Sequence, residues 1–199
     1  LLKEFGSAFH TARGSAASAE LLAEELAKSH QPVVWGATPV HGPIELALEQ
    51  VSFQYGEGFQ LEPASFTLEA GTSTALVGLS GSGKSTLLNI MAGLLPATSG
   101  RLLINGIPQE QVSEDEWFGQ LSYITQDPYV FAGTIKENIV LGTNRAVPPE
   151  ELVAAAQKAG ILELVESLPE EFDTMIGEAG RGLSGGEKQR IAICRVLLK

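Results

Sequence analysis

One eight-residue stretch limits what this chain can fold into more than any other feature. Residues 78–85 read Gly-Leu-Ser-Gly-Ser-Gly-Lys-Ser, which matches the pattern G-x-x-x-x-G-K-[ST]. A short apolar run at 74–77 precedes it, and apolar residues at helical spacing follow over 86–95. Strand, glycine-rich turn and helix in this order predict a phosphate-binding loop in an α/β fold.

The residue types in this loop suit a phosphate ligand. Glycines let the backbone curl so that successive amides point at phosphate oxygens, and the following helix adds its unpaired N–H groups. Lys84 supplies a charge to the outer phosphates, and the Ser85 hydroxyl is placed to bind Mg²⁺. The alternative is a glycine-rich turn without a ligand, which the flanking strand and helix disfavour. The motif therefore predicts nucleotide binding.

A second motif, Leu-Ser-Gly-Gly-Glu at 183–187, opens a predicted helix. Read locally, Ser184 and Glu187 form a capping box in which each side chain satisfies a backbone donor. That interpretation leaves Gly185 and Gly186 unexplained, because glycine in a helix costs about 1 kcal/mol relative to alanine unless something must approach the backbone closely. On the residues alone, a helix cap and a second phosphate site are equally well supported.

Charge and composition narrow the function further. The 199 residues include 24 Asp and Glu against 13 scattered Lys and Arg, for a net charge of −11, so we expect no nucleic-acid partner. The single cysteine, Cys194, lies among apolar residues of a predicted helix, where we expect it to pack as a small hydrophobic residue. No apolar window is long enough for a spanning helix, and a start at Leu1 rather than Met suggests a piece of a longer protein.

Changes of pattern divide the chain into three parts. Residues 1–30 predict a helix, and 31–43, rich in proline and glycine, a linker. Alternating runs within 44–69 predict two antiparallel strands with an irregularity near Gln50. Further strands are expected at 74–77, 101–104 and 121–124, and helices at 86–95, 113–118, 134–141, 148–159, 161–167 and 184–199. We therefore predict an α/β domain over 44–199, incomplete at its C-terminus, with a parallel sheet around the phosphate-loop strand, an antiparallel β layer and a helical subdomain over about 145–187.

Three motifs taken in order resemble a known family. The phosphate loop, Gln126 just after a predicted strand, and the 183–187 motif resemble the nucleotide-binding domain of ATP-binding cassette (ABC) transporters. Within that family, 131–138 and 174–180 are similar to motifs of exporter-type half-transporters, the second resembling the loop that touches the partner's coupling helix. The head of the chain, residues 2–13, is similar to the cytosolic extension of the last membrane helix in bacterial cysteine and glutathione exporters.

The resemblance implies a role for each motif residue. Tyr55 would stack on the adenine ring of ATP, with a place on the core face of its strand as the alternative. Gln126 would reach Mg²⁺ and the attacking water, and with Lys84 it would take part in catalysis. The 183–187 motif would bind the γ-phosphate of a nucleotide held by a second subunit. The implied ATP and Mg²⁺ site comprises Tyr55, Gly78, Leu79, Ser80, Gly81, Ser82, Gly83, Lys84, Ser85, Thr86, Gln126, Ser184, Gly185, Gly186 and Glu187, with Ser85 and Gln126 as the metal-binding residues.

Function, partners and location follow from the resemblance in the same way. It implies the ATP-binding subunit of an exporter that couples ATP binding and hydrolysis to export of a small solute, such as cysteine or glutathione, at the cytoplasmic face of the cell membrane. Its partners would be a second ABC subunit, in a homodimer or a heterodimer, and the transmembrane domain of the same transporter. Two alternatives stay open: a soluble ABC ATPase module acting on nucleic acid or ribosomes, and a phosphate-loop kinase.

The sequence departs from the family pattern at two places. Glu187 stands where glutamine is commonest. The chain also ends at Lys199, before the strand whose terminal Asp orders Mg²⁺ in the family and whose adjacent Glu is the general base. We therefore expect the full-length parent to be an ATPase, and this chain to bind ATP and hardly hydrolyse it.

Overall fold

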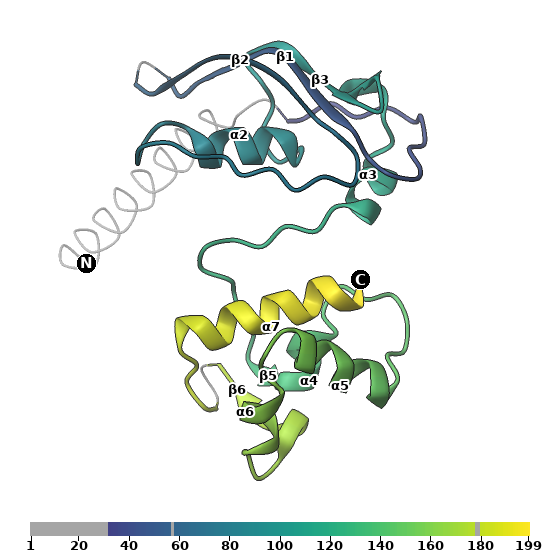
Figure 1. Ribbon diagram of the computed structural model, residues 1–199, viewed down its shortest axis with the longest axis vertical. Helices are drawn as coiled ribbons and strands as arrows, with labels where there is room; N and C mark the ends of the chain where they lie inside the picture. The colour runs from purple at the N-terminus through teal and green to yellow at the C-terminus, as the bar shows by residue number, and fades with distance from the viewer. Residues whose placement is uncertain (1–31, 57, 178–179) are drawn as a thin grey trace, which may run out of the picture. The chain divides into compact units, whose positions relative to one another are not determined.

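The computed structural model describes residues 32–56, 58–177 and 180–199, so the helix expected at 1–30 lies outside the described residues. The chain divides into two compact units, one ending at Trp117 and one running from Phe118 to Lys199 (Figure 1). The phosphate loop belongs to the first unit. Gln126 and the 183–187 motif belong to the second.

A four-stranded antiparallel sheet forms the frame of the first unit. Strand β1 (Leu46–Gln54) pairs with β2 (Gln60–Leu68) on one side and with β3 (Ser99–Ile104) on the other. The short β4 (Ile107–Pro108) extends the sheet beyond β3, in the order β2-β1-β3-β4. This confirms the predicted pair of antiparallel strands within 44–69 and the strand at 101–104.

The buried residues of β1 show why the ladder is irregular. Leu48, Val51 and Phe53 are all buried, so the spacing between Leu48 and Val51 breaks the period of two that a flat strand requires. The register shifts between these two residues, and Gln50 takes a left-handed conformation with φ 50°. The predicted irregularity near Gln50 is confirmed.

Two of the predicted strands are absent. Residues 74–77 and 121–124 have no strand assignment, and Val77 is 85% exposed. A strand exists through hydrogen bonds to a neighbour, and no described segment pairs with either run. The described residues thus form the expected antiparallel layer, whereas the parallel sheet predicted around the phosphate-loop strand is not formed among them.

Helix α2 (Lys84–Met91) follows the phosphate loop directly, and Figure 1 shows it on one side of the sheet. Leu87, Ile90 and Met91 are buried at helical spacing, as the apolar pattern predicts. The helix ends earlier than expected, because Gly93 adopts φ +74° just beyond its last turn.

Residues 32–40, within the predicted linker, run along the first unit. The backbone N–H groups of Gly36 and Thr38 donate to the carbonyl oxygens of Val112 and Gln111 at 2.8 Å each. The acceptors are the last residue of the single turn η1 (Gln109–Gln111) and the residue after it, just before helix α3 (Glu114–Gln120). The segment is therefore bound along its length, although a domain boundary at 31–43 stays a prediction.

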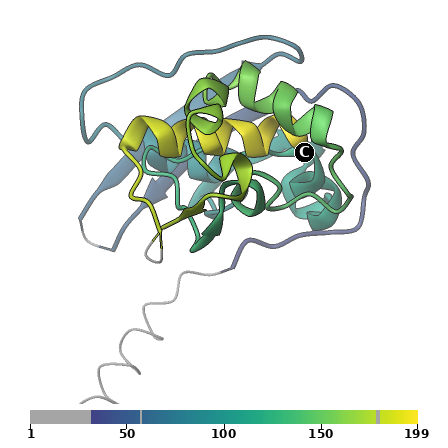
Figure 2. The same ribbon diagram turned by 90° about the horizontal axis from the view of Figure 1, so that it is seen from below.

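The second unit contains the helical subdomain predicted over about 145–187, together with a small two-stranded sheet. Its helices are α4 (Ile135–Ile139), α5 (Pro149–Lys158), α6 (Leu162–Glu166) and α7 (Gly185–Leu198), with a single turn η2 (Glu171–Asp173) between α6 and strand β6. Strands β5 (Gly133–Thr134) and β6 (Met175–Ile176) pair antiparallel, and at two residues each they are too short to show an alternating pattern in the sequence. Both α4 and α5 pack on α7, and Figure 2 shows α5 running along it.

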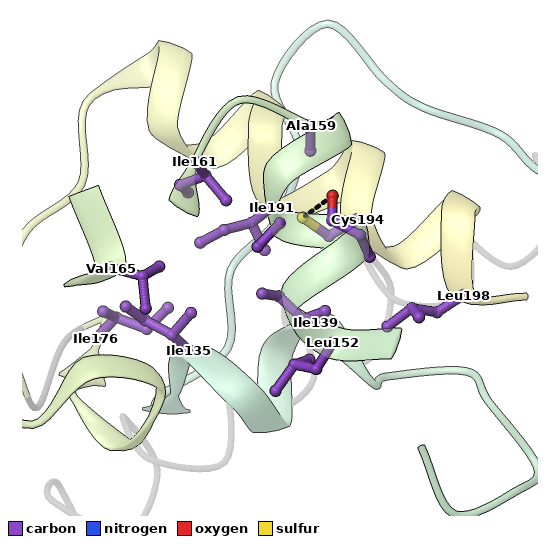
Figure 3. Close-up of a cluster of buried hydrophobic side chains, with 12 residues drawn as sticks. Ile135, Ile139, Leu152, Ala159, Ile161, Val165, Ile176, Ile191, Cys194 and Leu198 are labelled. Atoms are coloured by element: carbon purple, nitrogen blue, oxygen red, sulfur yellow. Dashed lines mark hydrogen bonds between the residues drawn. The ribbon is translucent and has the colours of Figure 1, made fainter. Parts of the chain in front are cut away.

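One buried cluster holds these helices together (Figure 3). Cys194 lies within it, fully buried, and its thiol contacts the carbonyl oxygen of Ala155 at 3.7 Å. Burial raises the pKa of this thiol to about 11. The expectation that Cys194 packs as a small hydrophobic residue is confirmed. The other labelled members of the cluster are Ile135, Ile139, Leu152, Ala159, Ile161, Val165, Ile176, Ile191 and Leu198.

Candidate functional site

The phosphate loop closes around its own lysine. The Lys84 ammonium donates to the carbonyl oxygens of Gly78 at 2.9 Å and Leu79 at 2.6 Å, and it lies 3.5 Å from Ser82 Oγ. These contacts hold the two ends of the loop together through one side chain. No carboxylate in the described part of the chain forms an ion pair with Lys84. Its charge is therefore not neutralised there and suits an anionic ligand.

The start of α2 carries no cap from its own chain. Gly83 occupies the N-cap position with φ 90° and has no side chain to accept a bond, and the first turn holds no acidic residue. The N–H groups of this turn therefore keep their donor capacity at the positive end of the helix dipole. A phosphate group is the ligand that such a helix start accommodates.

Ser85 and Thr86 lie in the first turn of this helix, and Ser85 is exposed. Mg²⁺ in nucleotide sites is bound by one or two protein oxygens together with substrate phosphates. A serine hydroxyl next to an uncapped, phosphate-binding helix start fits that donor set. Among the described residues, no group of three or more His, Cys, Asp or Glu side chains gathers to hold a metal.

An aromatic cluster lies beside the loop in the same unit. The ring of Tyr55 lies 4.5 Å from that of Phe53, edge to face, and 6.2 Å from that of Phe59. Phe59 in turn contacts the loop, since a Cβ atom added to Gly83 would lie 2.9 Å from its Cζ atom. Tyr55 follows the end of β1 and is 39% exposed, whereas Phe53 is the buried residue. The structure thus brings Tyr55 to the phosphate loop through Phe59, a residue that the sequence analysis did not single out.

Gln126 is exposed in the second unit, and its backbone is bound to α7. Its carbonyl oxygen accepts a hydrogen bond from Gln189 Nε2 at 3.3 Å. This bond joins the predicted metal-reaching residue to the helix that begins with the 183–187 motif. The structure therefore brings two of the predicted site elements together in one unit.

A buried polar network, missed by the sequence analysis, fixes the segment after Gln126. Asn138 is 2% exposed; its side chain bonds to both backbone groups of Phe131 at 2.9 Å and to the carbonyl oxygen of Thr134 at 3.0 Å. Arg195 on α7 donates to Asn138 O at 2.7 Å, to Asn138 Oδ1 at 3.0 Å and to Tyr129 O at 2.7 Å. These hydrogen bonds tie the loop to α7. An asparagine between two buried isoleucines of α4 was the signal that could have indicated it.

The 183–187 motif forms the predicted capping box. Ser184 Oγ accepts from the Glu187 N–H at 3.3 Å, and Glu187 Oε2 accepts from the Ser184 N–H at 2.7 Å. Arg181 donates to the other oxygen of Glu187 at 2.9 Å. The Ser184 amide, and then Arg181, hold the pKa of the Glu187 carboxyl below its ordinary value although partial burial opposes them. The cap interpretation of this motif is confirmed.

The two glycines of the motif border open space. A Cβ atom added at Gly185 would meet nothing within 4 Å, and one at Gly186 would meet only the Arg190 side chain, at 3.7 Å. Packing within the described chain therefore does not account for either glycine. Ser184 uses its oxygen as an acceptor in the cap and keeps its own proton to donate. The start of α7 thus remains open to an anion from outside the chain.

The order and geometry of these motifs define an ATP-binding module of the ABC transporter type. The family model described as "ABC transporter" matches residues 61–199, and the chain belongs to this family. The predicted resemblance and the α/β phosphate-loop fold class are thereby confirmed. None of the helices that the structure describes is long and apolar enough to cross a bilayer.

The particular relatives are transporters of the Atm1 and IrtB type. The chain is 40% identical over 164 residues to the mycobactin import ATP-binding/permease protein IrtB of Mycolicibacterium thermoresistibile, which covers 82% of this chain and 27% of that protein. It is 43% identical over 162 residues to the mitochondrial iron-sulfur clusters transporter ATM1 of Saccharomyces cerevisiae, covering 81% and 23%. A solved structure of a bacterial Atm1-family ABC exporter with ATP bound matches with a TM-score of 0.77 and 34% identity, over 94% of this chain and 33% of that one. The chain therefore spans about a quarter to a third of the length of these relatives.

Proposed function

We propose that this chain is the ATP-binding part of a dimeric, exporter-type transporter, in which the phosphate loop of each subunit faces the 183–187 motif of the other. The observation that carries the proposal is the contrast between two helix starts. The start of α2 is uncapped and has an unneutralised lysine beside it, whereas the start of α7 is capped by its own chain and exposes two glycines to open space. The first suits a nucleotide's phosphates, and the second suits close approach by a nucleotide on a partner subunit.

Each predicted site residue has a role in this proposal. The loop from Gly78 to Thr86 binds the phosphates, Lys84 contacts the outer ones, and Tyr55 stacks on the base. Mg²⁺, when bound, neutralises charge on the outer phosphates, and Ser85 and Gln126 are the residues that would hold it. In the longer protein, Lys84 and Gln126 act in ATP hydrolysis.

Contact with a transmembrane domain is the second part of the proposal. The segment after Gln126 carries two exposed aromatic rings, Tyr129 at 69% and Phe131 at 49% exposure, with their centroids 4.7 Å apart. Exposed apolar groups gathered in this way favour a protein partner. The polar network of Asn138 and Arg195 ties this surface to α7, so movement of the membrane partner would reach the 183–187 motif. A domain with such a partner would lie at the cytoplasmic face of a membrane.

The solute is proposed from the resemblance of residues 2–13 alone: a small thiol, cysteine or glutathione. The relatives carry other cargoes in their names, mycobactin and iron-sulfur clusters. ATPase stimulation by glutathione or cysteine, measured on the longer protein in lipid vesicles, tests the proposal. Stimulation by neither thiol would contradict it.

Nucleotide binding is tested with Lys84→Ala and a matched control. Lys158→Ala removes the same charge from an exposed position in the last turn of α5. We expect Lys84→Ala to weaken Mg-ATP binding at least tenfold, because a charge-assisted contact to phosphate contributes about 1.5–3 kcal/mol. Lys158→Ala should leave the affinity unchanged. Calorimetric titration measures both, and equal affinities would refute the proposed phosphate site.

The proposed pairing of the 183–187 motif with the phosphate loop of a second subunit is tested with Gly185→Glu. A side chain at this position meets nothing in its own chain, so the variant should fold and bind Mg-ATP at its own loop. It should fail to form the ATP-dependent dimer in sedimentation experiments, because the added carboxylate repels the partner's phosphates. Gly119→Glu, another position where an added Cβ meets nothing, adds the same charge elsewhere and should dimerise. An ATP-dependent dimer of Gly185→Glu would contradict the arrangement.

A further inference from the structure

The segment from residue 32 to residue 40, here called the strap, is bound to the first unit at several points. Besides the bonds from Gly36 and Thr38, the Ser113 N–H donates back to the Thr38 carbonyl oxygen at 2.8 Å. Gln109 Nε2 donates to the Val34 carbonyl oxygen at 2.9 Å, and the side chain of Val40 is 2% exposed. A segment that only connected two parts of the chain would not need backbone hydrogen bonds, a side-chain hydrogen bond and a buried side chain.

The strap reaches the far end of the phosphate-loop helix through one indole ring. A Cβ atom added to Gly93 would lie 2.6 Å from a Trp35 ring carbon and 3.2 Å from Trp117 Nε1. Trp117 also donates to the carbonyl oxygen of Ala92 at 2.9 Å. The C-terminal end of α2 is therefore held between an indole of the strap and an indole of α3, and the absence of a side chain at Gly93 allows the close approach.

We infer that the strap is a mechanical link through which the chain before Pro32 acts on the phosphate loop. Helix α2 has 8 residues from Lys84 to Met91, so about 12 Å separates its phosphate-binding start from the end that Trp35 contacts. A single short helix transmits a shift at one end to the other. The docked strap and a bound nucleotide thus favour each other, with Trp35 as a positioning residue. This inference rests on the proposed nucleotide site.

Reciprocity distinguishes this link from simple coverage of an apolar surface. If docking of the strap strengthens Mg-ATP binding by a given factor, saturating Mg-ATP must strengthen docking by the same factor. A strap that only covers the surface would lower stability when released and leave nucleotide affinity as it was. The two possibilities therefore differ in the affinity for Mg-ATP, which stability measurements do not report.

Two variants release the strap without changing α2 or the phosphate loop. In Gly36→Ala, the added Cβ would overlap the backbone of Gln111 and block the pairing. Trp35→Ala removes the indole and adds no clash. Gly119→Ala is the matched control, because it makes the same change as Gly36→Ala where the added Cβ meets nothing within 4 Å.

The experiment combines calorimetric titration of Mg-ATP with hydrogen exchange of the amides at positions 36 and 38, on the full chain. We expect Gly36→Ala to speed that exchange, and both Gly36→Ala and Trp35→Ala to weaken Mg-ATP binding at least fivefold. Gly119→Ala should do neither, and saturating Mg-ATP should slow exchange of the strap in the unsubstituted chain. Faster exchange with Mg-ATP affinity within twofold would overturn the link. Absence of Mg-ATP binding in the unsubstituted chain would overturn the proposed function and the link with it, whereas fast exchange of its strap amides would overturn the docking alone.

Discussion

Replacing Asn138 with alanine removes the centre of the polar network that joins α4, the loop after Gln126 and α7. Its amide makes three bonds to backbone groups of Phe131 and Thr134 and one to the Arg195 guanidinium. A typical neutral bond contributes about 0.5–1.5 kcal/mol, and one to a charged group about 1.5–3 kcal/mol. Alanine has a higher helix propensity than asparagine, which offsets about 0.5 kcal/mol of the lost stability.

The expected loss of stability is about 3 kcal/mol, from the lower part of these ranges. The lower part applies because Phe131 is 49% exposed, so water can replace some of the lost bonds. A loss of this size is a large fraction of the stability of a typical domain, which is about 5–15 kcal/mol.

Urea unfolding followed by far-ultraviolet circular dichroism measures this loss, because α4 to α7 supply most of the helix among the described residues. Tryptophan fluorescence serves as an internal reference, since Trp35 and Trp117 both lie in the first unit. Asn144→Ala, at an exposed position, is the control and should change stability by less than about 0.5 kcal/mol. A loss below about 1 kcal/mol for Asn138→Ala would refute the reasoning, because it lies under what two of these bonds should contribute.

Three further predictions concern other parts of the chain. Glu187→Gln should lose less folding stability than the unsubstituted chain when the pH is lowered from 7 into the acidic range. The pKa of Glu187 is lowered on folding, so the stability that its carboxylate contributes is present above the ordinary pKa of 4.5 and is lost as the pH falls through the folded value. Urea titrations that show an equal loss of stability in acid for both chains would contradict this. Cys194 should resist alkylation at pH 8 in the native chain and react quickly in urea, because burial raises the pKa of its thiol to about 11; rapid native labelling, followed by mass spectrometry, would contradict the burial. Gly83→Ala should weaken Mg-ATP binding and lower thermal stability more than Gly81→Ala. Both glycines have positive φ, at 90° and 80°, but only at Gly83 would the added Cβ clash with a side chain, at 2.8 Å from Leu61. Equal effects in the two glycine variants would show that backbone strain alone decides.

The local motifs could be read from the sequence because their chemistry depends on neighbouring residues. The spacing of glycines, Lys84 and Ser85 specifies a phosphate loop, and Ser184 with Glu187 specifies a capping box, since each bond spans only a few residues. The break between Leu48 and Val51 likewise predicts the irregularity at Gln50, because the period of a strand is local. Strands at 74–77 and 121–124 were wrongly predicted from apolar runs, because a strand needs a hydrogen-bonded neighbour that the run itself does not supply.

The sequence by itself therefore determined the family, the phosphate loop and the order of most helices and strands, all of which are encoded in short-range patterns. Only the tertiary structure revealed the contacts between residues far apart in the chain: Trp35 against Gly93, Phe59 against Gly83, and Arg195 against Asn138. Such contacts depend on how the backbone brings distant segments together, and the residue types alone do not specify their partners. Asn138 illustrates the difference, because a polar residue between buried isoleucines signals that partners exist, and only the fold shows that the distant Arg195 is one of them.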